Sequence, residues 1–174
     1  QRMMTSYIRI GGLGPEPPPG FFDRARGFIR AFPEHVDEYE NLLTENPIWR
    51  QRTRGVGRIS LADAIDLGAT GPILRGAGLA WDIRKAQPYS SYEKFDFEIP
   101  SLPDGDVYSR YQVRVAEMRQ SAHIVSQALD SMPEGPLMAD APKVVLPERE
   151  KMKTEMEALI YHFKIITEGF RVPA

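Results

Sequence analysis

The segment from Gly68 to Pro100 reads G-A-T-G-P-I-L-R-G-A-G-L-A-W-D-I-R-K-A-Q-P-Y-S-S-Y-E-K-F-D-F-E-I-P. Its first eleven positions hold the helix- and strand-breaking residues Gly68, Gly71, Pro72, Gly76 and Gly78. These residues argue against a regular helix or strand in the first part of the segment. Five aromatic residues follow, a heavy apolar load for a loop. The pattern therefore predicts an ordered, irregular segment held on a helical scaffold, where binding surfaces are often built.

Three stretches outside this segment repeat apolar residues at the spacing of a helix. They cover residues 21–43, 107–132 and 152–166. The first stripe keeps its phase across Pro33, which predicts one kinked helix or two nearly continuous helices. Pro147 suits the first turn of the last helix, and Gly169 suits its end. Stripes of this period favour antiparallel packing, so the three helices predict an incomplete antiparallel helical bundle.

Shorter signals complete the predicted fold. Ser60 with Asp63 favours a helix start, and Asp106 favours the start of the long second stripe. Residues 92–100 alternate aromatic with charged side chains and predict a half-buried strand, and residues 7–13 suit either a strand or a helix end. We therefore expect a mainly α fold with long irregular crossovers and one or two short strands. We expect a single domain over residues 1–174, as the central fragment of a longer subunit.

Composition excludes several classes of site. The sequence has no cysteine, which excludes disulfides, thiolate zinc sites and cysteine-ligated iron–sulfur clusters made by this chain alone. Its three histidines are far apart, so no metal site is expected. The net charge of −2 draws the chain neither to nucleic acid nor to an anionic membrane, and no apolar run is long enough to span one.

Two charged clusters stand out, and each has two interpretations. Arginines recur at positions 50, 52, 54 and 58, either as a phosphate or nucleic-acid patch or as partners of carboxylates at a surface or subunit contact. The second interpretation is favoured because the overall balance is acidic and no aromatic residues are interleaved. The trio Asp82, Arg84 and Lys85 is either a functional charge group or a structural ion-pair lattice at an interface.

Five segments carry a resemblance to a known family. They are N-P-I-W-R-Q-R-T-R-G-V-G (46–57), L-R-G-A-G-L-A-W-D-I-R-K-A-Q-P-Y (74–89), Y-E-K-F-D-F-E-I-P (92–100), D-V-Y-S-R-Y-Q-V-R-V-A-E-M-R-Q-S (106–121) and M-E-A-L-I-Y-H-F-K (156–164). In this order they resemble the 49-kDa subunit of respiratory complex I, the proton-pumping NADH:quinone oxidoreductase. Residues 74–89 resemble the hallmark segment of that family. The resemblance covers essentially the whole chain.

The resemblance implies a fold like that of the hydrogenase large subunit. It also implies a role beside quinone: in the family, this subunit and an iron–sulfur partner together form the quinone-reduction cavity. The partner ligates the terminal 4Fe–4S cluster, in keeping with the missing cysteines, so this chain alone is expected to bind no cofactor. The quinone-holding histidine and tyrosine of the family lie outside this piece, which is therefore expected to be inactive in isolation.

Two positions near the cluster in the family fall within this chain. The family commonly reads R-M-H-A-A-Y-x-R-P-G-G, against R-M-M-T-S-Y-I-R-I-G-G at residues 2–12 here. Arg9 matches the arginine of that motif, and Met4 stands where the family has a histidine linked to the pH dependence of the cluster. The hallmark segment supplies further site candidates as structural or interface residues: Arg75, Trp81, Asp82, Arg84, Lys85 and Tyr89.

The resemblance further implies a peripheral location on the cytoplasmic side of a bacterial inner membrane. The expected partners are the iron–sulfur subunit, other peripheral-arm subunits and quinone, with no nucleic acid. The alternatives are a nickel–iron hydrogenase-like large subunit of another membrane-associated complex and a non-enzymatic helical scaffold. An exposed bundle face predicts self-association of the isolated fragment.

Overall fold

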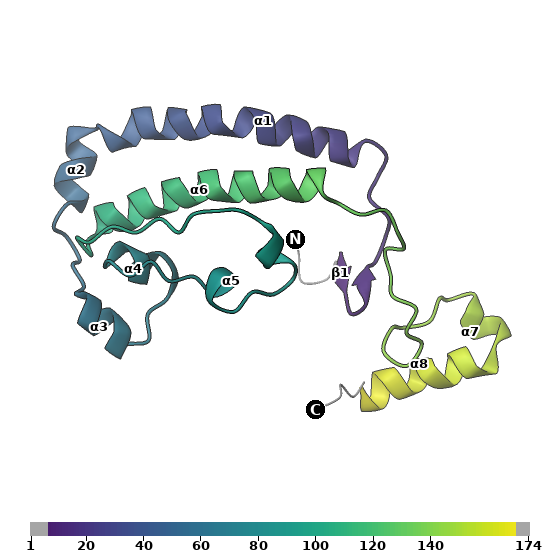
Figure 1. The fold of residues 1–174 in the computed structure, drawn as a ribbon. Helices are drawn as coiled ribbons and strands as arrows, with labels where there is room; N and C mark the ends of the chain where they lie inside the picture. The colour runs from purple at the N-terminus through teal and green to yellow at the C-terminus, as the bar shows by residue number, and fades with distance from the viewer. Residues whose placement is uncertain (1–6, 170–174) are drawn as a thin grey trace. The chain divides into compact units, whose positions relative to one another are not determined.

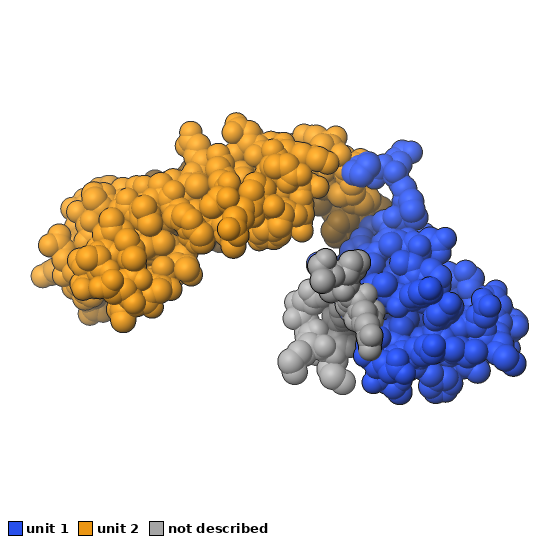
Figure 2. Space-filling view, turned by 60° about the horizontal axis from the view of Figure 1, so that its bottom comes forward, with its two compact units in different colours: residues 1–19, 133–174 blue, residues 20–132 orange. Residues whose placement is uncertain are grey.

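A computed structural model describes residues 7–169 of the chain. The chain forms two compact units, residues 1–19 with 133–174 and residues 20–132, which Figure 2 colours separately. Each unit is described by itself below. The predicted mainly α architecture is confirmed: helices dominate, and the described strands form one short hairpin (Figure 1). The single domain expected over residues 1–174 stays a prediction.

The first unit contains the strand hairpin. Strands β1 (Ile8–Arg9) and β2 (Gly12–Leu13) pair antiparallel, with Ile8 opposite Leu13. The later segment of the unit joins this hairpin, because Leu13 N donates to Leu137 O at 2.9 Å. Gly12 is required there, since a Cβ atom at its φ of +150° would lie 2.0 Å from Leu137 O. Of the two possibilities for residues 7–13, the structure shows the strand.

The last helical stretch is broken into two helices, α7 (Lys151–Thr154) and α8 (Met156–Glu168). Helix α7 begins four residues after Pro147, so the expected start at that proline is wrong. The break falls at Glu155, whose extended backbone (φ −119°, ψ 119°) cannot continue a helix. Helix α8 stops at Gly169, as predicted. Several large apolar side chains of α8 are exposed: Met156, Leu159, Ile160, Phe163 and Ile166.

The second unit is built on two long antiparallel helices, α1 (Phe21–Tyr39) and α6 (Val107–Asp130) (Figure 1). At one end Arg26 Nη2 donates to Leu129 O at 3.1 Å. At the other end, Thr44 Oγ1 lies 2.9 Å from the Tyr111 hydroxyl. The packing expected of the long helices is thus found between α1 and α6, whereas α8 belongs to the first unit.

Helix α1 runs through Pro33 without a break, so of the two alternatives for this stripe the structure shows one helix. It continues directly into the π-helical turn η1 (Glu40–Thr44). Asn46 then caps α2 (Pro47–Thr53), since its Oδ1 accepts hydrogen bonds from Ile48 N and Trp49 N. The chain therefore turns sharply between α1 and α2 at a polar cap.

The segment from Gly68 to Pro100 contains short helices that the glycine pattern did not predict. They are α4 (Gly71–Gly76), α5 (Ile83–Ala86) and the 3₁₀ turn η2 (Tyr92–Lys94), and α3 (Leu61–Asp66) precedes them. The Ser60 cap of α3 is confirmed, because Ser60 Oγ accepts from Asp63 N. Helix α4 begins at Gly71, has Pro72 in its first turn and ends at Gly76, so a short helix does form among the glycines. Ala64, Leu74 and Ala77 form a small buried core between α3 and α4.

The strand expected over residues 92–100 is wrong. After η2 the chain is extended, yet it pairs with no strand among the described residues. Side chains of α6 take the place of a neighbouring strand: Gln127 Oε1 accepts from Asp96 N, and Gln120 Oε1 accepts from Glu98 N. The alternation of the sequence still decides which side chain is buried, because Phe97 is only 2% exposed.

Candidate functional site

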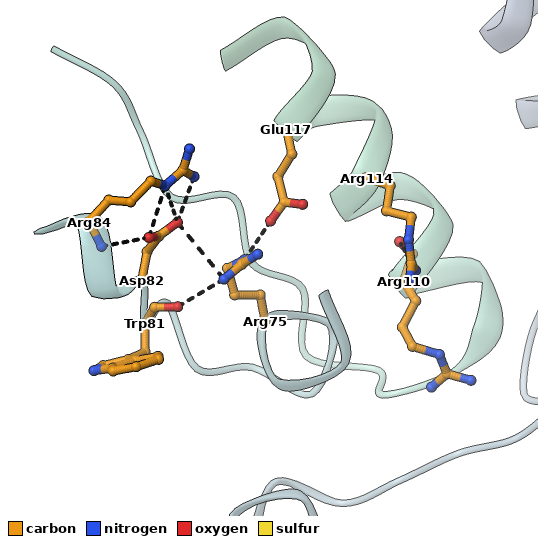
Figure 3. A network of polar contacts seen from close by, with 7 residues as sticks. All are labelled: Arg75, Trp81, Asp82, Arg84, Arg110, Arg114 and Glu117. Atoms are coloured by element: carbon orange, nitrogen blue, oxygen red, sulfur yellow. Dashed lines mark hydrogen bonds and ion pairs between the residues drawn. The ribbon is translucent and has the colours of Figure 1, made fainter. Parts of the chain in front are cut away.

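The hallmark segment is organised around Arg75, a buried arginine at the end of α4. Arg75 is 7% exposed, and Figure 3 shows its guanidinium between Asp82 and Glu117. Arg75 Nε donates to Glu117 Oε1 at 2.5 Å, and Arg75 Nη1 donates to the Trp81 carbonyl at 3.0 Å. One arginine thus fastens the irregular segment to the middle of α6. A charge this deep is stable only because carboxylates and a carbonyl surround it.

Close approach of α4 to α6 makes this contact possible. A Cβ atom at Gly76 would lie 3.0 Å from Arg110 Cγ and 3.4 Å from Arg110 N. Glycine at position 76 therefore lets α4 lie against α6 with little space between the backbones. Figure 3 shows Arg110 and Arg114 on the same stretch of α6 as Glu117. The first glycine of G-A-G (76–78) thus has a packing role in this contact.

Asp82 is the second buried charge of the site, 7% exposed. It caps α5, because Asp82 Oδ1 accepts from Arg84 N at 2.9 Å. The Arg84 side chain returns to the same carboxylate, with Nη2 2.7 Å from Oδ2. This side-chain hydrogen bond from Arg84 lowers the pKa of Asp82 below its ordinary value, against the opposing effect of burial. Arg75 adds a weaker attraction, its Nη1 lying 4.0 Å from Asp82 Oδ2.

Aromatic rings cover the outer side of Arg84. The guanidinium carbon lies 5.0 Å from the Phe97 ring centroid and 5.5 Å from that of Tyr92, and Lys85 Nζ lies 4.8 Å from the Phe97 centroid. The ring of Tyr89 meets Tyr92 edge to face at 5.1 Å. A continuous set of contacts therefore runs from Glu117 on α6 through Arg75, Asp82 and Arg84 to the aromatic turn.

The structure brings together most of the candidates that the hallmark segment supplied. Arg75, Asp82 and Arg84 share one network, and Lys85 and Tyr89 border its aromatic side. Trp81 takes part through its carbonyl oxygen, while the residue is 39% exposed. Glu117 was missed as a partner of Arg75, because 42 residues separate the two. Its position on the polar face of the long helix was the available signal. For Asp82 and Arg84 these contacts favour a structural ion-pair lattice over a functional charge group, whereas Lys85 contacts the Phe97 ring.

The arginines of positions 50–58 are not equivalent. Arg50 is held by its own neighbourhood, donating from Nη2 to Glu45 Oε1 and from Nε to Thr44 O. Arg54 instead stacks over Tyr108, with 4.7 Å between the guanidinium carbon and the ring centroid. Within the described residues, Arg50 is therefore the only arginine of this cluster that forms an ion pair with a carboxylate.

The structure describes only one of the two candidates near the amino terminus. Arg9 lies on β1, and its guanidinium borders Gly14, where an added Cβ atom would lie 2.9 Å from Arg9 Nε. Met4 lies outside the described residues. Between residues 7 and 169, no group of three or more His, Cys, Asp or Glu side chains is placed to hold a metal ion. No helix in that range is long and apolar enough to cross a bilayer.

Comparison with known proteins identifies the family. Residues 1–174 match the family described as the 49-kDa subunit of respiratory-chain NADH dehydrogenase. The chain is 67% identical over 173 residues to an NADH-quinone oxidoreductase subunit of Solibacter usitatus (strain Ellin6076), a match that covers 99% of this chain and 42% of that protein. It is 62% identical over 173 residues to an NADH-quinone oxidoreductase subunit of Koribacter versatilis (strain Ellin345), covering 99% of the chain and 43% of the relative.

A less similar relative has the same kind of name. An NADH-quinone oxidoreductase subunit of Geotalea uraniireducens (strain Rf4) is 50% identical over 172 residues, covering 99% of this chain and 44% of that protein. The chain thus spans about two fifths of the length of the curated relatives it matches. The match over all 174 residues is too extensive to reflect one shared motif. The chain belongs to the family of the 49-kDa subunit of respiratory-chain NADH dehydrogenase.

Proposed function

We propose that this chain is part of a subunit of proton-pumping NADH:quinone oxidoreductase, in which it helps form the quinone-reduction site. The observation that carries the proposal is the family match over the whole chain, together with relatives named as subunits of NADH-quinone oxidoreductase. The Arg75 network supports it as a structural element. It holds an irregular, partly exposed aromatic segment in one conformation, as a surface that must meet other subunits requires.

The cofactors of the proposed site would be quinone and a 4Fe–4S cluster. The sequence contains no cysteine, and the described residues hold no group of metal-binding side chains, so the chain does not fit the role of cluster ligand. The proposal therefore assigns the thiolate ligands to a partner iron–sulfur subunit. It assigns the protein to the periphery of the membrane, on its cytoplasmic side. These assignments follow the family resemblance.

Arg9 is the residue of this chain proposed to act on the cluster. A guanidinium near a cluster favours the reduced, more negative state, because opposite charges attract. Replacing Arg9 by glutamine should make the midpoint potential of the cluster more negative, on the order of 40 mV for an interaction of about 1 kcal/mol. Potentiometric titration followed by electron paramagnetic resonance measures that potential in the complex. An unchanged potential would remove Arg9 from the proposal.

Met4 is proposed to make the cluster insensitive to pH. It stands where the family resemblance places a histidine, and a thioether takes no proton at physiological pH. The midpoint potential should therefore stay nearly constant between about pH 6 and 8, and Met4→His should introduce a slope. A slope of about 59 mV per pH unit in the unmodified protein would contradict this assignment, since it would require one proton for each electron.

Purification of the full-length subunit from native membranes tests the proposal as a whole. The tagged protein should bring with it an iron–sulfur assembly that reduces quinone with NADH and is blocked by quinone-site inhibitors. An assembly driven by hydrogen instead would indicate a hydrogenase-like relative of the complex. Recovery of the tagged protein bound to nothing would favour a helical scaffold and refute the proposed function.

A further inference from the structure

Two arginines of the 50–58 cluster line a cavity that the proposed function does not use. Arg54 and Arg58 border a space of about 380 Å³ beside the start of α6. Both residues are exposed, and neither forms an ion pair within residues 7–169. The arginines at positions 50, 75, 84 and 119 all pair with carboxylates of the chain. Two guanidiniums that share one cavity therefore remain available to a partner.

The loop between these arginines is held firmly. Four hydrogen bonds tie this loop and Ile59 after it to the first turn of α6 or to the two residues before that helix. They run from Gly55 N to Asp106 Oδ2 (2.7 Å), from Val107 N to Val56 O (3.0 Å), from Ile59 N to Gly105 O (3.0 Å) and from Arg110 Nη2 to Gly57 O (3.0 Å). A loop fixed in this way loses little conformational freedom when a ligand binds. The stacking of Arg54 on the Tyr108 ring restricts that side chain further.

The carboxylates that border the cavity do not satisfy the arginines. Asp106 is 4% exposed, and its two oxygens accept hydrogen bonds from Gly55 N and Ser109 N. Burial raises the pKa of Asp106, but these two hydrogen bonds and the charge of Arg58 outweigh it, so the pKa lies below its ordinary value. Asp104 is exposed, and its Oδ2 lies 3.4 Å from Ser109 Oγ. The two oxygens of Asp106 are therefore already used by backbone N–H groups.

The two arginines of the cavity can bind an anion through paired hydrogen bonds. Two guanidiniums form strong, paired hydrogen bonds with carboxylates and phosphates alike. The carboxylates of Asp104 and Asp106 offset the charges of the two arginines, so the cavity has no excess positive charge that would favour a multiply charged phosphate over a singly charged carboxylate. The amide of Gln112 and the Asp104 carboxylate can bind polar groups that flank the incoming acid. These features fit an acidic side chain set in a polar protein surface.

We propose that the cavity lined by Arg54 and Arg58 receives an aspartate or glutamate side chain of a neighbouring subunit. The proposal rests on the proposed function in one respect, since it takes the chain to be part of a multi-subunit complex. It gives the arginine cluster a role in protein–protein docking rather than in nucleic-acid binding.

Carbodiimide cross-linking of the assembled complex tests this contact. Variants R54K and R58K keep the charge but replace the unreactive guanidinium by an amine. A carbodiimide activates a neighbouring carboxylate, and the lysine amine then displaces the activating group as a urea, leaving an amide bond with net loss of water. The full-length subunit carries each variant, and the cross-linked peptides are identified by mass spectrometry. R52K is the matched control, because Arg52 is exposed on the same segment but does not line the cavity.

The expected result is a cross-link from position 54 or 58 to an acidic residue of another subunit. It should be about tenfold more abundant than any such link in R52K, because a docked carboxylate is held at high effective concentration. An absence of links, or links only to Asp104 or Asp106 of the same chain, would overturn the proposal. Activity of the unmodified complex separates the two claims: an active complex without the link refutes the docking site alone, and an inactive preparation refutes the proposed function.

Discussion

Replacing Arg75 by methionine should open the hallmark segment locally without unfolding the helices around it. Methionine matches the length and apolar stem of arginine but removes the guanidinium. The substitution deletes the hydrogen bonds to Glu117 Oε1 and to the Trp81 carbonyl. It also leaves Glu117 without its cation, whereas Asp82 keeps Arg84 as a partner. The unpaired carboxylate of Glu117 should therefore account for most of the free energy lost from the closed conformation.

The burial of Glu117 sets the size of the expected change in the free energy of opening. Loss of one partner of a buried ion pair costs about 3–5 kcal/mol. The Glu117 side chain is 19% exposed, so water can partly solvate its carboxylate. The lower end of the range of about 3–5 kcal/mol therefore applies. A cost of about 3 kcal/mol corresponds to a roughly 100-fold increase in the opening equilibrium.

Amide hydrogen exchange of the full-length subunit, read by mass spectrometry, measures this opening peptide by peptide. Peptides that cover residues 74–87 should exchange about 100-fold faster in R75M, while peptides from the middle of α1 should change little. The double variant R75M/E117L should recover most of the protection, because it removes the unpaired carboxylate together with the arginine.

Arg119→Met is the matched control. Arg119 also joins α6 to another element through two carboxylates, Asp37 and Glu40, but its side chain is 38% exposed. Exposed pairs contribute up to about 1 kcal/mol, so R119M should change exchange by no more than about fivefold. Equal effects of R75M and R119M would refute the view that the buried network holds the segment in place.

Two further substitutions test other features of the second unit. Asp82→Asn should flatten the loss of stability in acid. The hydrogen bond from Arg84 lowers the folded-state pKa of Asp82 below its ordinary value, so the contribution of Asp82 to stability is full above its unfolded-state pKa and disappears as pH falls through its folded-state pKa. Unfolding in urea at several pH values measures this change. Gly105→Ala should lower the free energy of unfolding by roughly 3 kcal/mol or more, because its Cβ atom would lie 2.1 Å from Ile59 O at a φ of +67°. Gly20→Ala is the control: at a φ of +74° in open space it should lower that free energy by about 1 kcal/mol. A thermal unfolding temperature that falls equally in both variants would contradict this prediction.

The long helices of the second unit could be predicted because the apolar residues that stabilise them recur at the spacing of a helix. The apolar stripe over residues 21–43 continues through Pro33, and the structure shows a continuous helix there. The cap at Asp106 was equally visible, since an aspartate before an apolar stripe satisfies free backbone N–H groups. These signals depend on neighbours within a turn or two of the helix, so the sequence alone contains them.

The segment over residues 92–100 shows where local reasoning fails. Its alternation correctly marks Phe97 for burial, but the hydrogen-bonding partners of its backbone are Gln120 and Gln127 on α6. A pattern of period two reports which side chains are buried and cannot tell a strand partner from a row of glutamines. The pairing of Arg75 with Glu117 was missed for a related reason, since only the close packing of α4 on α6 brings the two together.

We propose that this chain belongs to a subunit required for NADH-driven quinone reduction. The most direct measurement is inhibitor-sensitive NADH:quinone reductase activity in membranes of a strain that lacks the gene for the full-length subunit. We predict that this activity is lost and that a plasmid copy of the intact gene restores it. Undiminished activity in the deletion strain, with no second copy of the gene present, would contradict the claim.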